Sequence, residues 1–240
     1  MIQYISEKDI EKIYGCKIPS LRRKKIAVII SAYDCEEYIE ECLDSVARQT
    51  YKPEKILLGI DGCKKTLAKV QNIMEKYNNL EVYYSQDNKG CYQMFNALIQ
   101  LVPEHYWIQI FGADDVMDDN MLNEIERYDF PVVSKNDGVL FFKKNLTKKV
   151  GGFRGWRCGA DSDMIIRIRF AINTYVRRAP QLFFRREHDK QLTRMSGTGY
   201  NSKLRLRYQK ITINNKNSLK PVIFIEPKCS KINRIYGRIE

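Results

Sequence analysis

Residues 26–62 read IAVIISAYDCEEYIEECLDSVARQTYKPEKILLGIDG, and this stretch decides the fold class. It begins with a short apolar run, Ile26–Ser31, which is typical of a buried strand. Apolar residues then recur at helical spacing within Glu36–Gln49, and a second apolar run follows at Lys55–Ile60. The order strand, helix, strand predicts two parallel strands joined by a right-handed crossover.

The same alternation continues as far as residue 111. Strands are predicted at Leu80–Ser85 and Tyr106–Phe111, and helices over Leu67–Tyr77 and Met94–Ile99. Strands that alternate with helices in this way predict an α/β fold, with a mostly parallel central sheet flanked by helices. Ligands of such sheets bind beyond the carboxyl ends of the strands, so the residues that follow each strand are the first candidates for a site.

Beyond residue 115 the pattern is less regular. The elements predicted there are a short helix within Met121–Tyr128, strands at Pro131–Ser134 and Val139–Phe142, a helix at Asp161–Val176 and a strand at Gln181–Arg186. Four arginines, Arg167, Arg169, Arg177 and Arg178, are expected on the solvated face of a helix, with attraction of a phosphate or an anionic membrane surface by some of them as the alternative. The tail from Ser196 is polar and basic, with one late apolar run at Val222–Ile225.

Composition narrows the classes of protein. The 240 residues include 44% hydrophobic ones and the mean hydropathy is -0.46, which fits a globular protein rather than a disordered one. The net charge is +12, yet no zinc-finger spacing or aromatic RNA-binding box accompanies it, so nucleic acid is not an expected partner. Seven cysteines without a CxxC pair favour reduced thiols over a zinc ribbon or a disulfide scaffold.

The sequence also carries an expectation about location. No apolar run approaches the roughly 20 residues that a membrane-spanning helix needs. Residues Met1–Tyr14 alternate charged and apolar side chains, which is not the pattern of a secretory signal. We therefore expect a cytoplasmic protein, with peripheral contact to a membrane through its basic C-terminal region as a further expectation.

Polar residues follow all four predicted parallel strands. They are Ser31-Ala32-Tyr33-Asp34, Asp61-Gly62, Asn88-Lys89-Gly90 and Gly112-Ala113-Asp114-Asp115. Singly they are ordinary, because an Asp-Gly pair is usually a turn and paired aspartates often cap a helix. Together they converge on one edge of the sheet, where paired carboxylates suit Mg²⁺ or Mn²⁺ bound jointly with substrate phosphates.

With these residues in place, the chain resembles glycosyltransferase family 2, whose members have the GT-A fold. Residues 24–49, KKIAVIISAYDCEEYIEECLDSVARQ, are similar to that family's first strand, loop and helix. The later matches are Ile60-Asp61-Gly62 (Asp-Asp-Gly-Ser turn), Asn88-Lys89-Gly90 with Asn96 (Asn-x-Gly…Asn), Phe111-Gly112-Ala113-Asp114-Asp115 (Asp-x-Asp), Gly151-Gly152-Phe153 (Gly-Gly-Phe), Asp161-Ser162-Asp163-Met164 (Glu-Asp-x-Asp/Glu-Leu) and Arg185-Arg186-Glu187-His188 (Arg-x-x-His). The ordered set covers about residues 25–195.

The resemblance implies a site for a nucleotide-diphosphate sugar. The residues it implies for that site are Ala32, Tyr33, Asp61, Asn88, Gly90, Asp114 and Asp115. The first three would contact the nucleobase, most often uracil, so a UDP-sugar is the favoured donor. Asp114 would ligate Mn²⁺ or Mg²⁺, with His188 as a further metal or phosphate contact, and Asp115 would lie in the same ribose–phosphate shell.

On the acceptor side, the resemblance implies that Asp161 is the general base, with Asp163 as the alternative, and that Trp156 lines the acceptor pocket. Sugar would move with inversion to the hydroxyl of a glycan, a lipid-linked or a protein acceptor. The implied domain organisation has a GT-A domain between two extensions. Its parts are an N-terminal extension (1–24), a nucleotide-binding half (25–115) and an acceptor half (116–195), and a basic C-terminal extension packed on the domain (196–240).

The match has three departures. Gly112 replaces the first acid of Asp-x-Asp, Ile60 replaces the first Asp of the Asp-Asp-Gly turn, and Phe95 replaces the usual Arg before Asn96. Loss of the first carboxylate removes a ribose or metal contact, so a catalytically weak relative that binds nucleotide-sugars is one alternative. A nucleotidyltransferase is another, although the first loop, SAYDCEEY, lacks the glycines of a phosphate loop. A basic module that binds nucleic acid or a membrane surface is the third alternative.

Overall fold

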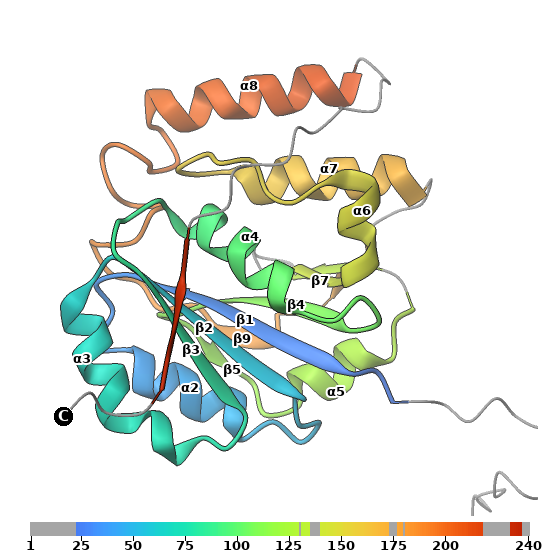
Figure 1. Cartoon of the computed structure of the whole chain (residues 1–240). Coiled ribbons are helices and arrows are strands. Elements are labelled where there is room, and N and C mark those ends of the chain that lie inside the picture. The colour runs from blue at the N-terminus through green and yellow to red at the C-terminus, as the bar shows by residue number, and fades with distance from the viewer. Residues whose placement is uncertain are drawn as a thin grey trace, which may run out of the picture.

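A computed structural model describes residues 23–129, 131–134, 140–172, 177–179, 181–217 and 231–236. Within these ranges an eight-stranded sheet runs through the molecule, with helices on both of its faces (Figure 1). The strand order is β10-β3-β2-β1-β4-β7-β6-β8. The predicted fold class, an α/β protein with a mostly parallel central sheet, is confirmed.

The four central strands are the ones that the sequence predicts. They are β1 (Ile26–Ala32), β2 (Lys55–Asp61), β3 (Leu80–Ser85) and β4 (Trp107–Gly112). Their pairings with one another are parallel, and Ala32 lies opposite Ile60 while Ser31 lies opposite Gly112. The carboxyl ends of β1, β2 and β4 therefore reach the same edge of the sheet, which we call the rim.

Alternation along the strands divides the core between two faces. Val28 and Ile30 of β1 pack into the cluster that holds α2 (Ile39–Ala47) and α3 (Lys64–Ile73). Ala27 and Ile29 face the opposite way, into the cluster of α4 (Cys91–Leu101) and α7 (Ala160–Ile172). Both faces of the strand are apolar because both are covered, as expected for a parallel sheet. The remaining helical elements are η1 (Met74–Lys76), α5 (Met121–Glu126), η2 (Lys144–Leu146), α6 (Thr147–Val150) and α8 (Lys203–Asn217).

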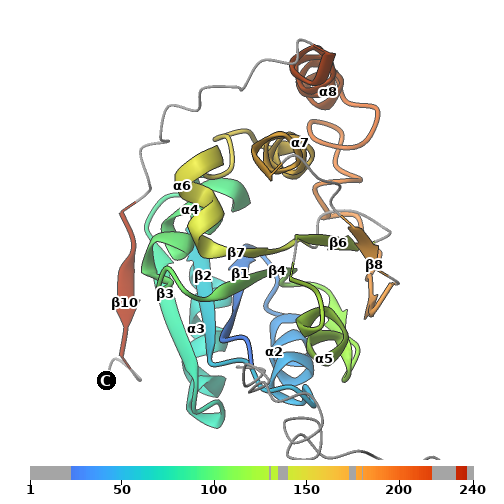
Figure 2. The same ribbon diagram turned by 90° about the vertical axis from the view of Figure 1, so that its right-hand side faces the viewer.

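Antiparallel strands extend the sheet on both sides (Figure 2). β7 (Leu140–Lys143) pairs with β4, β6 (Val132–Ser134) pairs with β7, and β10 (Asn233–Ile235) pairs with β3. β8 (Arg177–Ala179) is parallel to β6. A separate two-stranded sheet joins β5 (Val116–Met117) to β9 (Phe183–Phe184). This small sheet brings the chain after residue 184 alongside the segment that follows β4.

The second half of the chain differs in detail from the prediction. The predicted strand at Gln181–Arg186 is reduced to β9, and α8 and β10 have no predicted counterpart. The helix predicted to reach Val176 is described as far as Ile172, and the predicted apolar run at Val222–Ile225 lies outside the described residues. The domain boundaries at residues 24 and 195 remain a prediction.

The prediction of a solvated helix face is wrong for Arg167, which is buried, and for Arg177 and Arg178, which lie in strand β8. The Arg167 side chain is 4% exposed, and its guanidinium donates to Asp163 Oδ2 at 2.8 Å, to the Gly152 carbonyl at 2.7 Å and to the Val150 carbonyl. Asp163 is 2% exposed and also accepts from Arg154 Nε at 3.0 Å. A buried guanidinium needs such partners, and they join α7 to the end of α6.

Removing the Asp163 carboxylate is therefore expected to destabilise the fold. Asp163→Ala leaves the Arg167 guanidinium buried beside no counter-charge, which costs about 3–5 kcal/mol in the free energy of unfolding. Urea unfolding monitored by circular dichroism measures this difference. Ser162→Ala, at the exposed neighbouring position, is the control and should stay within about 0.5 kcal/mol of the parent. A loss below about 1 kcal/mol for Asp163→Ala would contradict the structural role.

Candidate active site

Asp61, the last residue of β2, organises the loop that follows β3. The side chain is 2% exposed, and its two oxygens accept the backbone N–H groups of Lys89 at 2.9 Å and Gly90 at 2.7 Å. Burial raises the pKa of this carboxyl group, and the two N–H donors act in the opposite direction. Asp61 therefore places Asn88 and Gly90 at the rim, and each oxygen keeps a second lone pair for a ligand.

The turn after Asp61 requires glycine. Gly62 has φ +77°, and a Cβ there would lie 2.6 Å from the backbone nitrogen of Asn88. Arg157 contacts the loop that holds Asn88, and its guanidinium donates to Asn88 Oδ1 at 2.9 Å. The Arg157 guanidinium also lies 3.2 Å from the position that a Cβ on Gly90 would occupy. Sequence reasoning did not single out Arg157, because no motif contains it.

A second acidic group follows β4. His188 Nε2 lies 3.0 Å from Asp114 Oδ2, and Gln191 Nε2 lies 3.4 Å from the same oxygen. Asp115 Oδ1 accepts the backbone N–H of Arg186 at 3.2 Å. Burial, helped by the neighbouring charge of Asp114, raises the pKa of Asp115 to about 7. The β5–β9 pairing thus joins the two predicted metal contacts, Asp114 and His188.

Gly112, at the position of the missing first acid, fits closely against this group. A Cβ there would lie 2.9 Å from Asp115 Oδ2 and 3.0 Å from Asp114 Oδ1. Any larger residue at this position would require both carboxylates to turn away. In the arrangement described here, a small residue therefore allows Asp114 and Asp115 to fold back over the end of β4.

The His188 imidazole packs against the ring of Tyr38. Its ring centroid lies 4.9 Å from that of Tyr38, and the Arg186 guanidinium lies 4.8 Å from the same Tyr38 ring. His188 Nδ1 is buried and has no hydrogen-bond partner within the described part of the chain. Packing, rather than a hydrogen bond to Nδ1, therefore orients the ring toward Asp114.

Asp161 and Asp163 stand in different environments although both begin α7. The hydroxyl of Tyr92 donates to Asp161 Oδ1 at 2.9 Å, and the Asp161 side chain is half-buried. Burial and the Asp161 charge raise the pKa of Tyr92 well above its usual value, so the hydroxyl keeps its proton and remains a donor. Asp163 is fully enclosed by Arg154 and Arg167. Residues two apart on a helix point in different directions, which explains the contrast.

The loop that leads to α7 is fixed by Asn96. Asn96 Nδ2 donates to the Phe153 carbonyl at 2.8 Å, and the Phe153 N–H donates back to Asn96 Oδ1 at 2.7 Å. A Cβ on Gly152 would lie 2.2 Å from Asn96 Oδ1, so glycine is required there. Phe95, in place of an arginine, packs its ring 5.8 Å from that of Phe153 and 6.4 Å from that of Tyr92.

The remaining predicted residues lie on either side of this group. Ala32 is buried at the end of β1, whereas Tyr33 is 56% exposed beside it. The Trp156 ring stacks on Tyr208 of α8, with centroids 4.3 Å apart and planes inclined by 3°. The Arg154 guanidinium lies 5.5 Å from the same indole centroid. Trp156 therefore joins α8 to the loop before α7, and the acceptor contact predicted for it stays a prediction.

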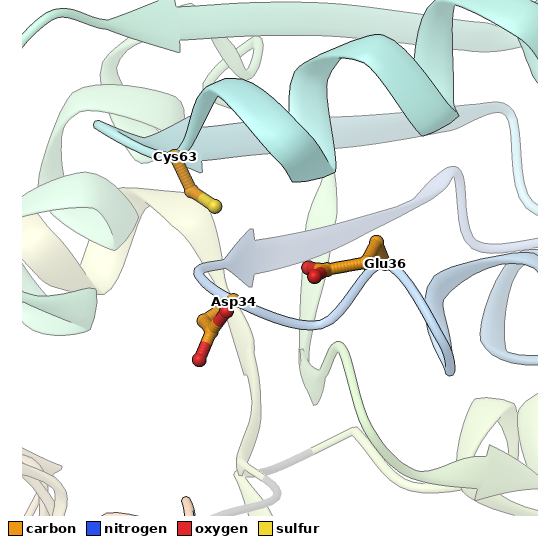
Figure 3. A group of neighbouring side chains, drawn as sticks. All are labelled: Asp34, Glu36 and Cys63. Carbon is orange, nitrogen blue, oxygen red and sulfur yellow. The ribbon is translucent and has the colours of Figure 1, made fainter.

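A cluster that sequence reasoning missed lies beside the rim. One ligand atom each from Asp34, Glu36 and Cys63 falls within 4.8 Å of the others (Figure 3). Asp34 has φ +50° and forms an ion pair with Lys190 at 3.0 Å. The signal in the sequence was their position, directly after β1 and β2. Exposed acidic groups often gather in this way without a cation.

Two buried thiols lie close to the acidic groups of the site. Burial, Asp161 and Asp61 together raise the pKa of the Cys91 thiol to about 12. Burial and Asp114 raise the pKa of the Cys35 thiol to about 12. Cys91 begins α4 next to Gly90, so the Asp61 loop and Asp161 act on the same atom. Such a site can bind a cation and phosphate groups and can accept a proton at Asp161.

An α/β sheet with acidic residues at the carboxyl ends of its strands belongs to the class of open α/β folds whose ligands bind at that edge. Within that class, residues 27–158, more than half of the chain, match the family model described as glycosyl transferase family 2. The chain belongs to this family. The predicted membership is confirmed, and with it the assignment to the glycosyltransferases.

Curated proteins that are similar to this chain are also glycosyltransferases. The chain is similar to the glycosyltransferase GlyG of Streptococcus pneumoniae, with 27% identity over 129 residues, 49% of this chain and 42% of that protein. It is also similar to GlyA of the same organism, with 29% identity over 91 residues, 38% of this chain and 13% of that protein. The chain spans less than half the length of these two relatives.

Solved structures share the fold. A mannosyltransferase from Pyrobaculum calidifontis, PcManGT, in complex with GDP-Man and Mn²⁺, has a TM-score of 0.58 and 18% identity, covering 69% of this chain and 57% of that one. TarS of S. aureus (residues 1–349), in complex with UDP-GlcNAc, has a TM-score of 0.55 and 15% identity, covering 81% and 72%. The GT-A fold is thereby confirmed.

Proposed function

We propose that this domain transfers a sugar from a nucleotide-diphosphate sugar, with UDP-sugar favoured, to an acceptor hydroxyl. The observation that carries the proposal is the placement of carboxylates near the rim: Asp61 ends β2, Asp114 follows β4, and Asp161 of α7 acts together with Asp61 on the Cys91 thiol. The fold relatives in complex with GDP-Man and with UDP-GlcNAc support a donor of this chemical class.

The donor would lie across the ends of β1, β2 and β4. Tyr33 offers an exposed ring for a nucleobase, and Asp61 has lone pairs for a base or ribose donor. The Asn88–Gly90 loop and Arg157 would face the diphosphate, since a guanidinium and backbone N–H groups at the start of α4 both favour anions.

A divalent cation, Mn²⁺ or Mg²⁺, fits the second acidic group. Asp114 offers a carboxylate oxygen and His188 an imidazole nitrogen 3.0 Å away, and this pair of donor types suits Mn²⁺. Asp115 would add charge in the same shell. When bound, the cation would stabilise negative charge on the departing nucleoside diphosphate.

Asp161, rather than Asp163, would be the general base. It would take the proton of the acceptor hydroxyl as that oxygen bonds to the anomeric carbon and the bond to the diphosphate oxygen breaks, which inverts the anomeric carbon. Tyr92 would hold the Asp161 carboxylate in place. Base catalysis of this kind contributes about 10²–10⁴-fold in rate. Asp163 is already committed to two arginines.

The acceptor would approach from the loop before α7. Trp156 stands at the edge of that loop, and the acceptor contact predicted for it would use the part of its ring that Tyr208 leaves open. A glycan, a lipid-linked sugar or a protein hydroxyl each satisfies the chemistry at Asp161, since the base needs only a hydroxyl group.

A thermal-shift screen over nucleotide-sugars, with and without Mn²⁺ or Mg²⁺, tests the proposal. A donor at a concentration of 100 times its Kd should stabilise the folded state by about 2.7 kcal/mol, and more strongly with the cation than without it. The free sugar and the nucleoside monophosphate are the controls. Stabilisation by nucleic acid instead, with no response to any nucleotide-sugar, would favour the basic binding module and contradict a transferase.

A further inference from the structure

We propose that the outer face of α8 docks on an anionic membrane surface. In Figure 1, α8 lies over α7 on the side away from the sheet. Its inner face is occupied by side chains that are buried or stacked on other elements. Arg205 is 8% exposed and donates through Nε to the Thr198 carbonyl at 2.8 Å, Thr212 is 6% exposed, and Tyr208 stacks on Trp156.

The outer face combines aliphatic and basic side chains. Leu206 is 52% exposed and Ile213 is 54% exposed, and their spacing of seven residues puts them on one stripe of the helix. Lys203 and Lys210 are exposed, have the same spacing and run beside that stripe. Large apolar side chains with lysines alongside are typical of a helix that lies in the headgroup region of a bilayer.

The charge of the surrounding sequence points to an anionic partner. From Lys190 to Asn217 the chain has no aspartate or glutamate. The cations of this stretch are Lys190, Arg194, Lys203, Arg205, Arg207, Lys210 and Lys216. Anionic lipid headgroups attract such a segment from solution. A nucleic acid would also bind these cations through its phosphates, but nucleic-acid binding would not explain why Leu206 and Ile213 are exposed.

The proposed contact of α8 with the membrane is peripheral and does not involve a membrane-spanning helix. Among the helices in the described ranges, none is long and apolar enough to span a bilayer. Because Tyr208 stacks on Trp156, docking through α8 would bring the loop before Asp161 toward the lipid. This consequence rests on the proposed function: it would favour an acceptor carried by a lipid. Docking itself needs neither donor nor turnover, so the two proposals can fail separately.

Vesicle co-sedimentation tests the docking. The full chain should sediment with vesicles of phosphatidylcholine and phosphatidylglycerol, and not with phosphatidylcholine alone. Lys203→Glu with Lys210→Glu should lower the partition coefficient about tenfold or more, and so should Leu206→Ser with Ile213→Ser. The matched control reverses two exposed lysines on the α2–α3 side of the sheet, Lys52→Glu with Lys65→Glu, and should change it far less.

Three outcomes would overturn the proposal. The first is that the parent chain remains in the supernatant with phosphatidylglycerol vesicles. The second is that the control pair loses as much binding as the lysine pair of α8, which would indicate net charge alone. The third is that the Leu206–Ile213 pair binds vesicles like the parent while a single-stranded RNA probe binds the parent and not the lysine pair, which would indicate a nucleic-acid surface. Unchanged circular dichroism spectra would show that the variants remain folded.

Discussion

Asp161→Asn is expected to abolish sugar transfer and to leave donor binding nearly intact. The amide keeps the size of the side chain and can still accept from the Tyr92 hydroxyl, but it cannot take a proton from an acceptor. We expect kcat to fall by roughly 10³-fold or more, which is the size of effect that the loss of a general base produces. Release of nucleoside diphosphate in a coupled assay, alongside titration calorimetry with the donor, separates the two quantities.

Ser162→Ala provides the control, because it alters the exposed neighbouring position and keeps both carboxylates of α7. It should retain the activity of the parent. The Asp161→Asn protein should also retain the parent's unfolding midpoint, unlike Asp163→Ala, since only Asp163 is enclosed by arginines. Normal turnover by Asp161→Asn would remove Asp161 from the mechanism.

Asp114→Ala is expected to weaken both donor binding and turnover. The substitution removes the carboxylate that faces His188 and Gln191, and with it the proposed ligand of the cation. We expect kcat/KM to fall by roughly 10³-fold, and the dependence of donor affinity on Mn²⁺ to be lost. Steady-state kinetics over a range of Mn²⁺ concentrations measure both effects.

Asp119→Ala is the matched control for Asp114→Ala. It removes a carboxylate from the same segment, but this one is exposed and only forms a surface ion pair with Arg48 at 3.5 Å. The control should keep the activity and the Mn²⁺ response of the parent. Equal activity of Asp114→Ala and Asp119→Ala would show that Asp114 is not a ligand of the metal.

Much of the fold could be predicted from the sequence, because β1, β2 and β4 are mostly apolar, buried runs and amphipathic helices separate the strands. A strand buried on both faces must be apolar throughout, and that requirement leaves a clear signal. The outer elements give a weaker signal. β10 is a three-residue edge strand, mostly exposed, that is defined by its pairing with β3, and α8 carries basic residues on all sides, so neither has a strong periodic pattern.

For the site, sequence order revealed which residues follow the strands but not what each one contacts. The approach of His188 to Asp114 depends on the pairing of β5 with β9, two strands of two residues that no local pattern indicates. The difference between Asp161 and Asp163 depends on Arg154 and on Arg167, which was expected in solvent. The pairing of β5 with β9 is long-range and is a property of the folded chain, and the partners of Asp163 follow from how α7 packs.

The most direct test of the central claim is a crystal structure of the chain with UDP and Mn²⁺, with the metal located by its anomalous scattering. The account predicts one Mn²⁺ about 2.1 Å from an Asp114 carboxylate oxygen and in contact with the diphosphate. It also predicts the uracil beside Tyr33 and Asp61. Manganese at Asp34, Glu36 and Cys63 with none at Asp114, or a nucleotide bound away from the carboxyl ends of β1, β2 and β4, would contradict it.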